Sequence, residues 1–288
     1  LDRLGASSSE TKAIIAAVRE FGKGDKPKAS ADGPKENLSE DQTNQVLAFS
    51  SREAAHIAEM ALAALRDDGE IKAGKIAEIS PINGGPEAAD LALFGRMSTG
   101  NALSTIKAAC SVAHAISTNH CPQMKDFFTA VDDISGQTGS AHMGDISFSA
   151  PIHYFYFAVD IELLIGNLNG NKTLAHDSIL GMVSAMMHTS PSARQSSMAS
   201  FPTPSFLLLE LSKNMTPVSY TNAFMNPVDR LGIPVSTGLD GVARNALLDH
   251  MHRIDYQFDI ERDTRIMFPD SETPTVGVLM ERLADALN

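Results

Sequence analysis

Asp132, Asp133 and His142 are the residues best suited to catalysis in this 288-residue chain. Two carboxylates and a histidine could hold a divalent metal ion that activates water for phosphodiester hydrolysis. Asp132 and Asp133 are adjacent, however, and neighbouring residues of a strand point to opposite faces, which prevents easy convergence on one ion. No other potential metal ligand lies at a suitable spacing from His142, so this histidine is more typical of a structural residue in a turn. A metal-dependent nuclease using these three residues is therefore the alternative hypothesis, and we predict no catalytic residue, no metal site and no cofactor.

The same part of the chain is better suited to binding. Residues 95–97 (Gly-Arg-Met) combine a glycine, which lets backbone approach a ligand closely, with a flexible thioether. Residues 119–151 lie between two predicted strands, are too long for an ordinary hairpin loop, and mix glycines with apolar side chains. Because neighbours on a strand face opposite ways, we expect one of Phe127 and Phe128 to pack in the core. We favour Phe128 for ligand contact.

Five segments carry a resemblance to a known family. They are Asp-Leu-Ala-Leu-Phe-Gly-Arg-Met (90–97), Val-Ala-His-Ala-Ile-Ser-Thr (112–118), Phe-Phe-Thr-Ala-Val-Asp-Asp (127–133), Gly-Ser-Ala-His-Met-Gly (139–144) and Asn-Ala-Phe (222–224). In order and spacing they resemble CasC, the repeated RNA-binding backbone subunit of the type I-E CRISPR Cascade complex, within the Cas seven superfamily. The resemblance covers residues 90–225 and is loose on either side.

The resemblance implies a noncatalytic subunit that assembles head to tail along a CRISPR guide RNA and presents the guide for pairing with target DNA in antiviral defence. Its partners would be the guide RNA, target DNA through guide pairing, copies of itself and other Cascade subunits. Residues 119–151 would form a thumb that crosses the guide RNA bound by the neighbouring copy. The predicted RNA-contact residues are Arg96, Met97, Ser98, Phe128, Ser140, His142, Met143, Arg194 and Gln195.

Some of these roles have a structural alternative. Met97 is expected to wedge between bases, but methionine is also a common filler of protein cores. Arg96 and Arg194 are the best candidates for phosphate, because a guanidinium binds phosphate with two parallel hydrogen bonds. The alternative for each arginine is a solvated loop charge.

Periodicity in the sequence predicts an α+β fold. Residues 1–89 read as a helical finger region, with a capping box at Ser7 and Glu10, a helix that ends at Gly69, and a flexible loop at 22–38. In the remainder, residues 90–288, several segments alternate between apolar and small or polar residues with a period of two, as strands do. We expect strands at 106–116, 155–163 and 206–211 and a helix at 179–187, with His114 in the core.

This order matches the later part of a ferredoxin-like (RRM-like) palm sheet, into which residues 119–151 insert as a thumb hairpin. In the family a palm strand and a basic helix come first, and neither is found in these residues. We therefore expect the chain to be truncated at its amino terminus.

Composition constrains the partners. The net charge of −12 argues against a general nucleic-acid binder, because nonspecific affinity comes from lysine and arginine at phosphates. Truncation would reconcile this charge with RNA binding if the missing part is basic. Two cysteines, Cys110 and Cys121, and the lack of a long apolar run or signal segment predict a cytoplasmic protein with no membrane partner.

Overall fold

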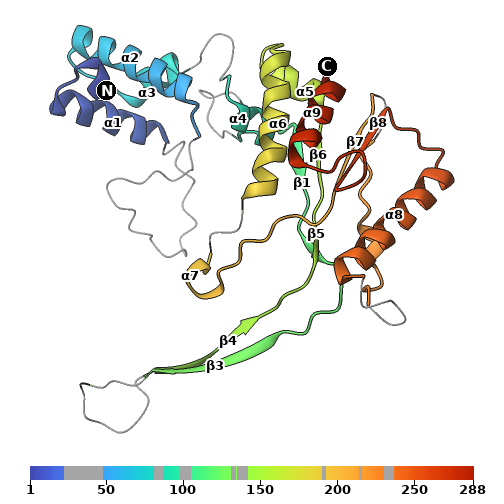
Figure 1. The fold of residues 1–288 in the computed structure, drawn as a ribbon. Coiled ribbons are helices and arrows are strands. Elements are labelled where there is room, and N and C mark those ends of the chain that lie inside the picture. Colours follow the sequence, from blue (N-terminus) through green and yellow to red (C-terminus); the bar gives the residue numbers. More distant parts are fainter. Residues whose placement is uncertain are drawn as a thin grey trace, which may run out of the picture. The chain divides into compact units, whose positions relative to one another are not determined.

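The computed structural model describes residues 1–22, 48–80, 87–97, 105–130, 134, 142–189, 193–213, 216–229 and 237–288. They form a mixed α+β protein in which the described strands make four two-stranded sheets. Figure 1 labels the helices and strands along the chain. The chain divides into two compact units, one of residues 1–111 and 158–183 and the other of residues 112–157 and 184–288. The predicted α+β class is confirmed at this level, whereas a ferredoxin-like palm stays a prediction.

Three helices open the first unit, after a short 3-10 turn at Asp2–Leu4 (η1). They are α1 (Ser8–Gly22), α2 (Ser51–Asp68) and α3 (Ala73–Ile79), and they pack around Ile14, Ala17, Ile57, Ala61, Leu62, Ile76 and Ile79. The predicted capping box is present, since Ser7 N donates to Glu10 Oε2 and Glu10 N donates to Ser7 Oγ. Gly69 ends α2 in the left-handed conformation, as expected of a glycine at this position. The helical character of the described part of 1–89 is therefore confirmed.

The rest of the first unit contains α4 (Ala89–Phe94), α5 (Ile161–Asn167) and most of α6 (Lys172–His188). α6 buries Ala175, Ile179, Val183 and Met187, one residue per turn, which confirms the predicted helix at 179–187. Of the expected strand at 155–163, only Phe157–Val159 forms one (β6), so the expectation is wrong on both sides of that short strand. The Asp160 side chain accepts a hydrogen bond from Leu163 N at 2.9 Å, and this cap starts α5 where the apolar pattern predicted a strand.

The expected continuous strand at 106–116 is also wrong. It consists of β1 (Cys110–Val112) and β2 (Ile116–Ser117), which pair with β6 (Phe157–Val159) and β5 (His153–Tyr154) respectively. His114 lies in the interruption between β1 and β2 and is exposed, so its predicted core position is wrong. Alternation of residue types cannot show where strand pairing is interrupted.

In the second unit, β7 (Leu207–Leu211) and β8 (Thr264–Phe268) form an antiparallel pair, which confirms the predicted strand at 206–211. α8 (Leu239–Gln257) and the 3-10 turn η2 (Thr221–Phe224) share a core with side chains preceding and within β7, among them Phe206 and Leu208. α9 (Val276–Leu287) packs against β8, and the short α7 (Gln195–Met198) precedes β7.

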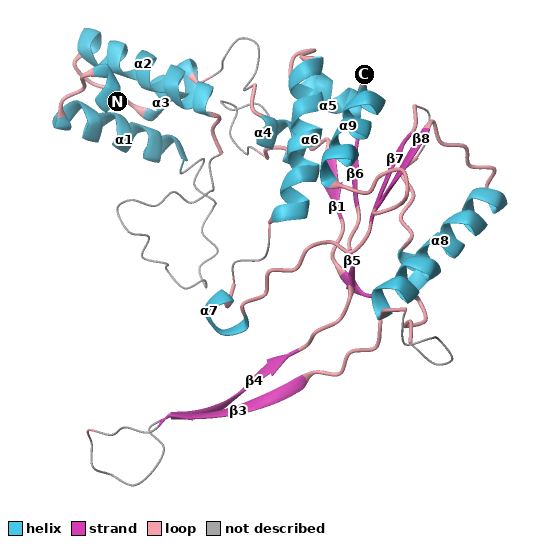
Figure 2. Cartoon of the chain, viewed as in Figure 1, coloured by secondary structure: helices cyan, strands magenta, loops and turns pink. Residues whose placement is uncertain are grey.

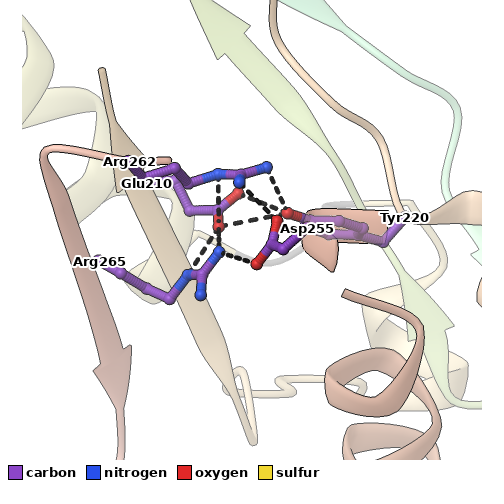
Figure 3. Close-up of polar contacts among 5 residues, drawn as sticks. All are labelled: Glu210, Tyr220, Asp255, Arg262 and Arg265. Carbon is purple, nitrogen blue, oxygen red and sulfur yellow. Dashed lines mark hydrogen bonds and ion pairs between the residues drawn. The ribbon is translucent and has the colours of Figure 1, made fainter. Parts of the chain in front are cut away.

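A network of five polar side chains attaches the end of α8 to this sheet (Figure 3). Glu210 of β7 lies opposite Arg265 of β8, and Arg265 also contacts Asp255 of α8 at 2.7 Å. Arg262 Nε lies 2.8 Å from Glu210 Oε1, and Tyr220 donates to Glu210 Oε2 at 2.9 Å. Burial and the nearby Glu210 carboxylate raise the pKa of Tyr220. Two arginines thus balance two carboxylates, as partly buried charges require.

The second unit also contains a long β-hairpin, which Figure 2 shows in magenta. Its strands are β3 (Met124–Ala130) and β4 (His142–Phe148), antiparallel in register from Met124↔Phe148 to Ala130↔His142. Below the hairpin, Thr118 N donates to Ile152 O at 2.8 Å and Ile152 N donates to Asn119 Oδ1 at 2.9 Å. These bonds bring together the two ends of the segment 119–151.

Candidate nucleic-acid interface

Met97 is one of the most exposed apolar side chains in the described part of the protein. It follows α4, and its side chain is 86% exposed. A methionine that filled a core would have little exposure, so the structural alternative for Met97 is not supported. The thioether is available to a ligand, as the binding hypothesis requires.

Arg96, the preceding residue, has a different environment. Its guanidinium Nη1 donates to Glu53 Oε2 at 2.8 Å and to the Ala48 carbonyl at 3.0 Å, and both charged side chains are only 3% exposed. Burial alone would raise the pKa of Glu53, but hydrogen bonds from Arg96 and from the Ser50 backbone bring that pKa below its ordinary value. In this structure Arg96 therefore binds a carboxylate in the interior, and its predicted role as a phosphate ligand at the surface is not what the geometry shows.

The β3–β4 hairpin carries apolar side chains on both faces. On one face, Phe128 covers Gly144 and its ring centroid lies 5.4 Å from that of His142. On the other face, Phe127 is 65% and Met143 59% exposed. Neither phenylalanine enters a core, so the expected division into one core residue and one contact residue is wrong. No described residue of β3 or β4 is buried, and Phe127 is the more exposed of the two phenylalanines.

The charges of the hairpin do not make it a basic surface. Its described strands carry Lys125, Asp126 and Asp145, and Lys125 Nζ lies 2.9 Å from Asp145 Oδ2 in an exposed ion pair. Such pairs contribute at most about 1 kcal/mol. Contact with a nucleic acid through these strands would therefore depend on apolar and stacking interactions rather than on cations.

Arg194 and Gln195 lie at the start of α7. Arg194 is exposed and has left-handed backbone dihedrals, with φ 55° and ψ 25°. Gln195 Nε2 donates to the Ser200 carbonyl at 2.6 Å, so its amide holds its own turn together. The guanidinium of Arg194 can reach a solvent ligand, and the choice between phosphate and a solvated loop charge stays open.

The structure places Phe128 and His142 on one face of the hairpin and Met143 on the other, whereas Arg96 and Met97 belong to the other unit. Ser98, Ser140, Asp132 and Asp133 lie outside the described residues, as does most of the predicted loop at 22–38. The described ranges contain no group of three or more potential metal ligands from histidine, cysteine, aspartate and glutamate. Nor does any helix in those ranges have the length and apolar character needed to cross a membrane.

Sequence reasoning missed the buried partner of Arg96 and chose the less exposed of two adjacent phenylalanines for ligand contact. Glu53 could have been found, because Ser50 and Glu53 have the spacing of a capping box and form one, with Ser50 N donating to Glu53 Oε2 at 2.8 Å. The pairing of Glu53 with Arg96 could not be found in this way, because the two residues are 43 positions apart in the sequence. Phe127 was considered, but the expectation of a core below the hairpin assigned the contact to its neighbour.

The fold of this chain is similar to that of chains in solved structures. A chain described as "CRISPR RNA-guided surveillance complex, pre-nicking" matches with a TM-score of 0.70 and 21% identity, covering 100% of this chain and 80% of that chain. A second, described as "CRISPR RNA-guided surveillance complex", matches with a TM-score of 0.59 and 21% identity, covering 83% of this chain and 86% of that chain. A search of curated proteins finds no significant match. A family model described as "CT1975-like protein" matches residues 2–286. The chain belongs to the CT1975-like protein family.

Proposed function

We propose that this chain is a noncatalytic, RNA-binding backbone subunit of a CRISPR surveillance complex, of the type I-E CasC kind. It binds the guide RNA mainly through the RNA backbone and leaves the bases free to pair with target DNA. Its other partners are further copies of itself and the remaining subunits of the complex. No cofactor takes part, and we place the protein in the cytoplasm.

The observation that carries this proposal is the β3–β4 hairpin. A two-stranded hairpin is marginal by itself, and a protein gains nothing in stability from apolar side chains exposed on both of its faces. Phe127 and Met143 on one face and Phe128 beside His142 on the other can each take part in contacts with bases or a neighbouring subunit. The likeness of the fold to chains of RNA-guided complexes supports this interpretation.

In this proposal the segment 119–151 is the thumb, residues 1–89 are the finger region, and residues 90–288 are the palm with a ferredoxin-like sheet. The thumb of one copy crosses the RNA held by the next, so copies follow one another head to tail. A heterologous interface of this kind has no symmetry that ends it at a fixed number of copies. The length of the RNA then sets the number of copies in the assembly.

The test is size-exclusion chromatography of the chain with single-stranded RNAs of increasing length. We expect oligomers whose size grows with the RNA, and we expect deletion of 136–144 to abolish them without loss of the circular dichroism spectrum. The double change Phe127→Ala with Met143→Ala should act in the same direction. Its matched control is Tyr256→Ala, which removes an aromatic side chain that is 87% exposed on α8 and should change nothing. Oligomers that form normally without residues 136–144 would refute the thumb assignment.

A further inference from the structure

The buried ion pair between Arg96 and Glu53 is attached to the start of α2. Glu53 Oε2 accepts from Arg96 Nη1 at 2.8 Å and from Ser50 N at 2.8 Å, and the second bond is half of the capping box that begins the helix. Arg96 Nη1 also donates to the carbonyl of Ala48 at 3.0 Å, just before that box. The Arg96 guanidinium therefore binds the N-terminal end of α2, which lies far from Arg96 in the sequence.

The backbone of residue 96 is fixed as well. Arg96 N donates to Ile106 O and Ile106 N donates to Arg96 O, both at 2.9 Å, in an isolated antiparallel bridge. Gly95 has φ +78°, and a Cβ there would lie 2.8 Å from Ile106 O, so only glycine allows this approach. In extended backbone, neighbouring side chains point to opposite sides. A buried Arg96 consequently directs Met97 outward.

We propose that Arg96 is a positioning residue, whose buried ion pair with Glu53 holds the extended segment so that Met97 projects from the surface as an RNA-contact residue. The contact itself rests on the proposed function, but the positioning does not. Arg96 acts through Met97 and touches no RNA. Loss of either charge leaves the other buried without an opposite charge, which is costly and drives rearrangement of the segment.

The chain offers a matched control for this arrangement. At the start of α1, Ser7 and Glu10 form a second capping box, and Arg66 Nε donates to Glu10 Oε1 at 2.8 Å. The motif is the same, a Ser-x-x-Glu box completed by an arginine from elsewhere in the chain, but it is at the surface and no predicted contact residue follows Arg66. Arg66→Gln therefore removes a similar ion pair without affecting Met97.

The first measurement needs no RNA. A nitroxide on Met97→Cys, in a Cys121→Ser background that leaves only the buried Cys110, reports the motion of this position by electron paramagnetic resonance. We expect Glu53→Gln and Arg96→Gln to narrow the spectrum, Arg96→Lys to restore part of the ordering, and Arg66→Gln to leave it unchanged. Glutamine at 53 keeps the capping box, so α2 is preserved. Spectra unchanged by loss of either charge would overturn the proposal.

A single unpaired buried charge could unfold the unit, and the double variant Glu53→Gln with Arg96→Gln removes both charges to avoid this. It should fold, as judged by circular dichroism, and still show the narrowed nitroxide spectrum. An ordered nitroxide in the folded double variant would equally count against positioning by the ion pair.

The second measurement separates the two proposals. A single-stranded RNA with 2-aminopurine fluoresces more strongly where a base is unstacked. We expect the unmodified protein to raise this fluorescence. The Met97→Ala and Arg96→Gln variants should lose the increase, while Arg66→Gln keeps it. If Met97→Ala retains the increase, the RNA-contact role of Met97 is wrong, whatever the nitroxide shows. If Met97→Ala loses it but Arg96→Gln does not, the contact holds and the positioning role of Arg96 is wrong.

Discussion

Met97→Ala should leave the stability of the protein almost unchanged and weaken its capture of nucleic acid. Burying a whole methionine side chain is worth about 1.5–3 kcal/mol, but only about one seventh of the Met97 surface is removed from water. Truncation should therefore cost about 0.2–0.4 kcal/mol of unfolding free energy. The matched control is Met251→Ala on α8, a side chain with 0% exposure, where the loss should be about 2–5 kcal/mol.

The assay pairs urea unfolding, followed by circular dichroism, with capture of target DNA by the complex assembled on guide RNA. Stacking of a base on an aromatic side chain is worth about 1–3 kcal/mol, and a thioether should give less, so one copy contributes little. If copies repeat along the RNA as proposed, the losses add up, and capture of target DNA should fall clearly. A stability loss of about 2 kcal/mol or more for Met97→Ala would show that this side chain is packed in a core, and our assignment would be wrong.

Three further predictions concern the scaffold. Gly95→Ala should lower the free energy of unfolding by about 1–3 kcal/mol in urea titrations, because its Cβ would meet Ile106 O at positive φ. Ion pairing with an arginine and the capping box lower the pKa of Glu10 from 4.5 to about 2, so its contribution is present above pH 4.5 and is lost as the pH falls toward 2. Glu10→Gln should flatten the pH dependence of thermal unfolding in that window. Tyr220→Phe should cost about 1.5–3 kcal/mol, since its hydroxyl bonds to charged partners, whereas the exposed Tyr256→Phe should cost nothing measurable.

Each of these has a result that would contradict it. A stability for Gly95→Ala equal to wild type would mean that the Arg96 segment adjusts easily. If Glu10→Gln unfolds thermally with the same acid dependence as wild type, the ion pair of Glu10 does not contribute to the pH dependence of stability. Equal stabilities for the two tyrosine variants would show that the network in Figure 3 is not a source of stability.

Local signals in the sequence predicted the start of α1, the end of α2 and the later part of α6. The capping box at Ser7 and Glu10 and the glycine at 69 depend only on residues within one turn, and both act as expected. Ile161 was predicted to lie in a strand because apolar alternation continues past Val159, and only the side chain of Asp160 ends it. His114 was predicted to be buried because alternation cannot reveal that pairing stops between β1 and β2.

The candidate site was predicted in part. Met97 is exposed and the segment 119–151 contains an elongated hairpin, as the resemblance to the family implies, whereas contact of these residues with RNA stays a prediction. The burial of Arg96 could not be predicted, because its partner Glu53 lies 43 residues away and the pairing depends on tertiary structure. Likewise, a two-residue Phe-Phe pattern predicts opposite faces but not whether either face meets a core.

The exposure of the β3–β4 hairpin has a consequence for how its amides exchange with solvent deuterium. Among the described residues, none from β3 or β4 belongs to the buried core, so we expect the hairpin to open without unfolding the rest of its unit. Its amides should exchange long before those of β7 and β8, whose Leu209 and Ile266 are buried. Binding of any ligand that orders the hairpin must then offset the conformational entropy that the hairpin loses. Slowed exchange confined to residues 124–130 and 142–148 would measure how much of the binding free energy is used in this ordering.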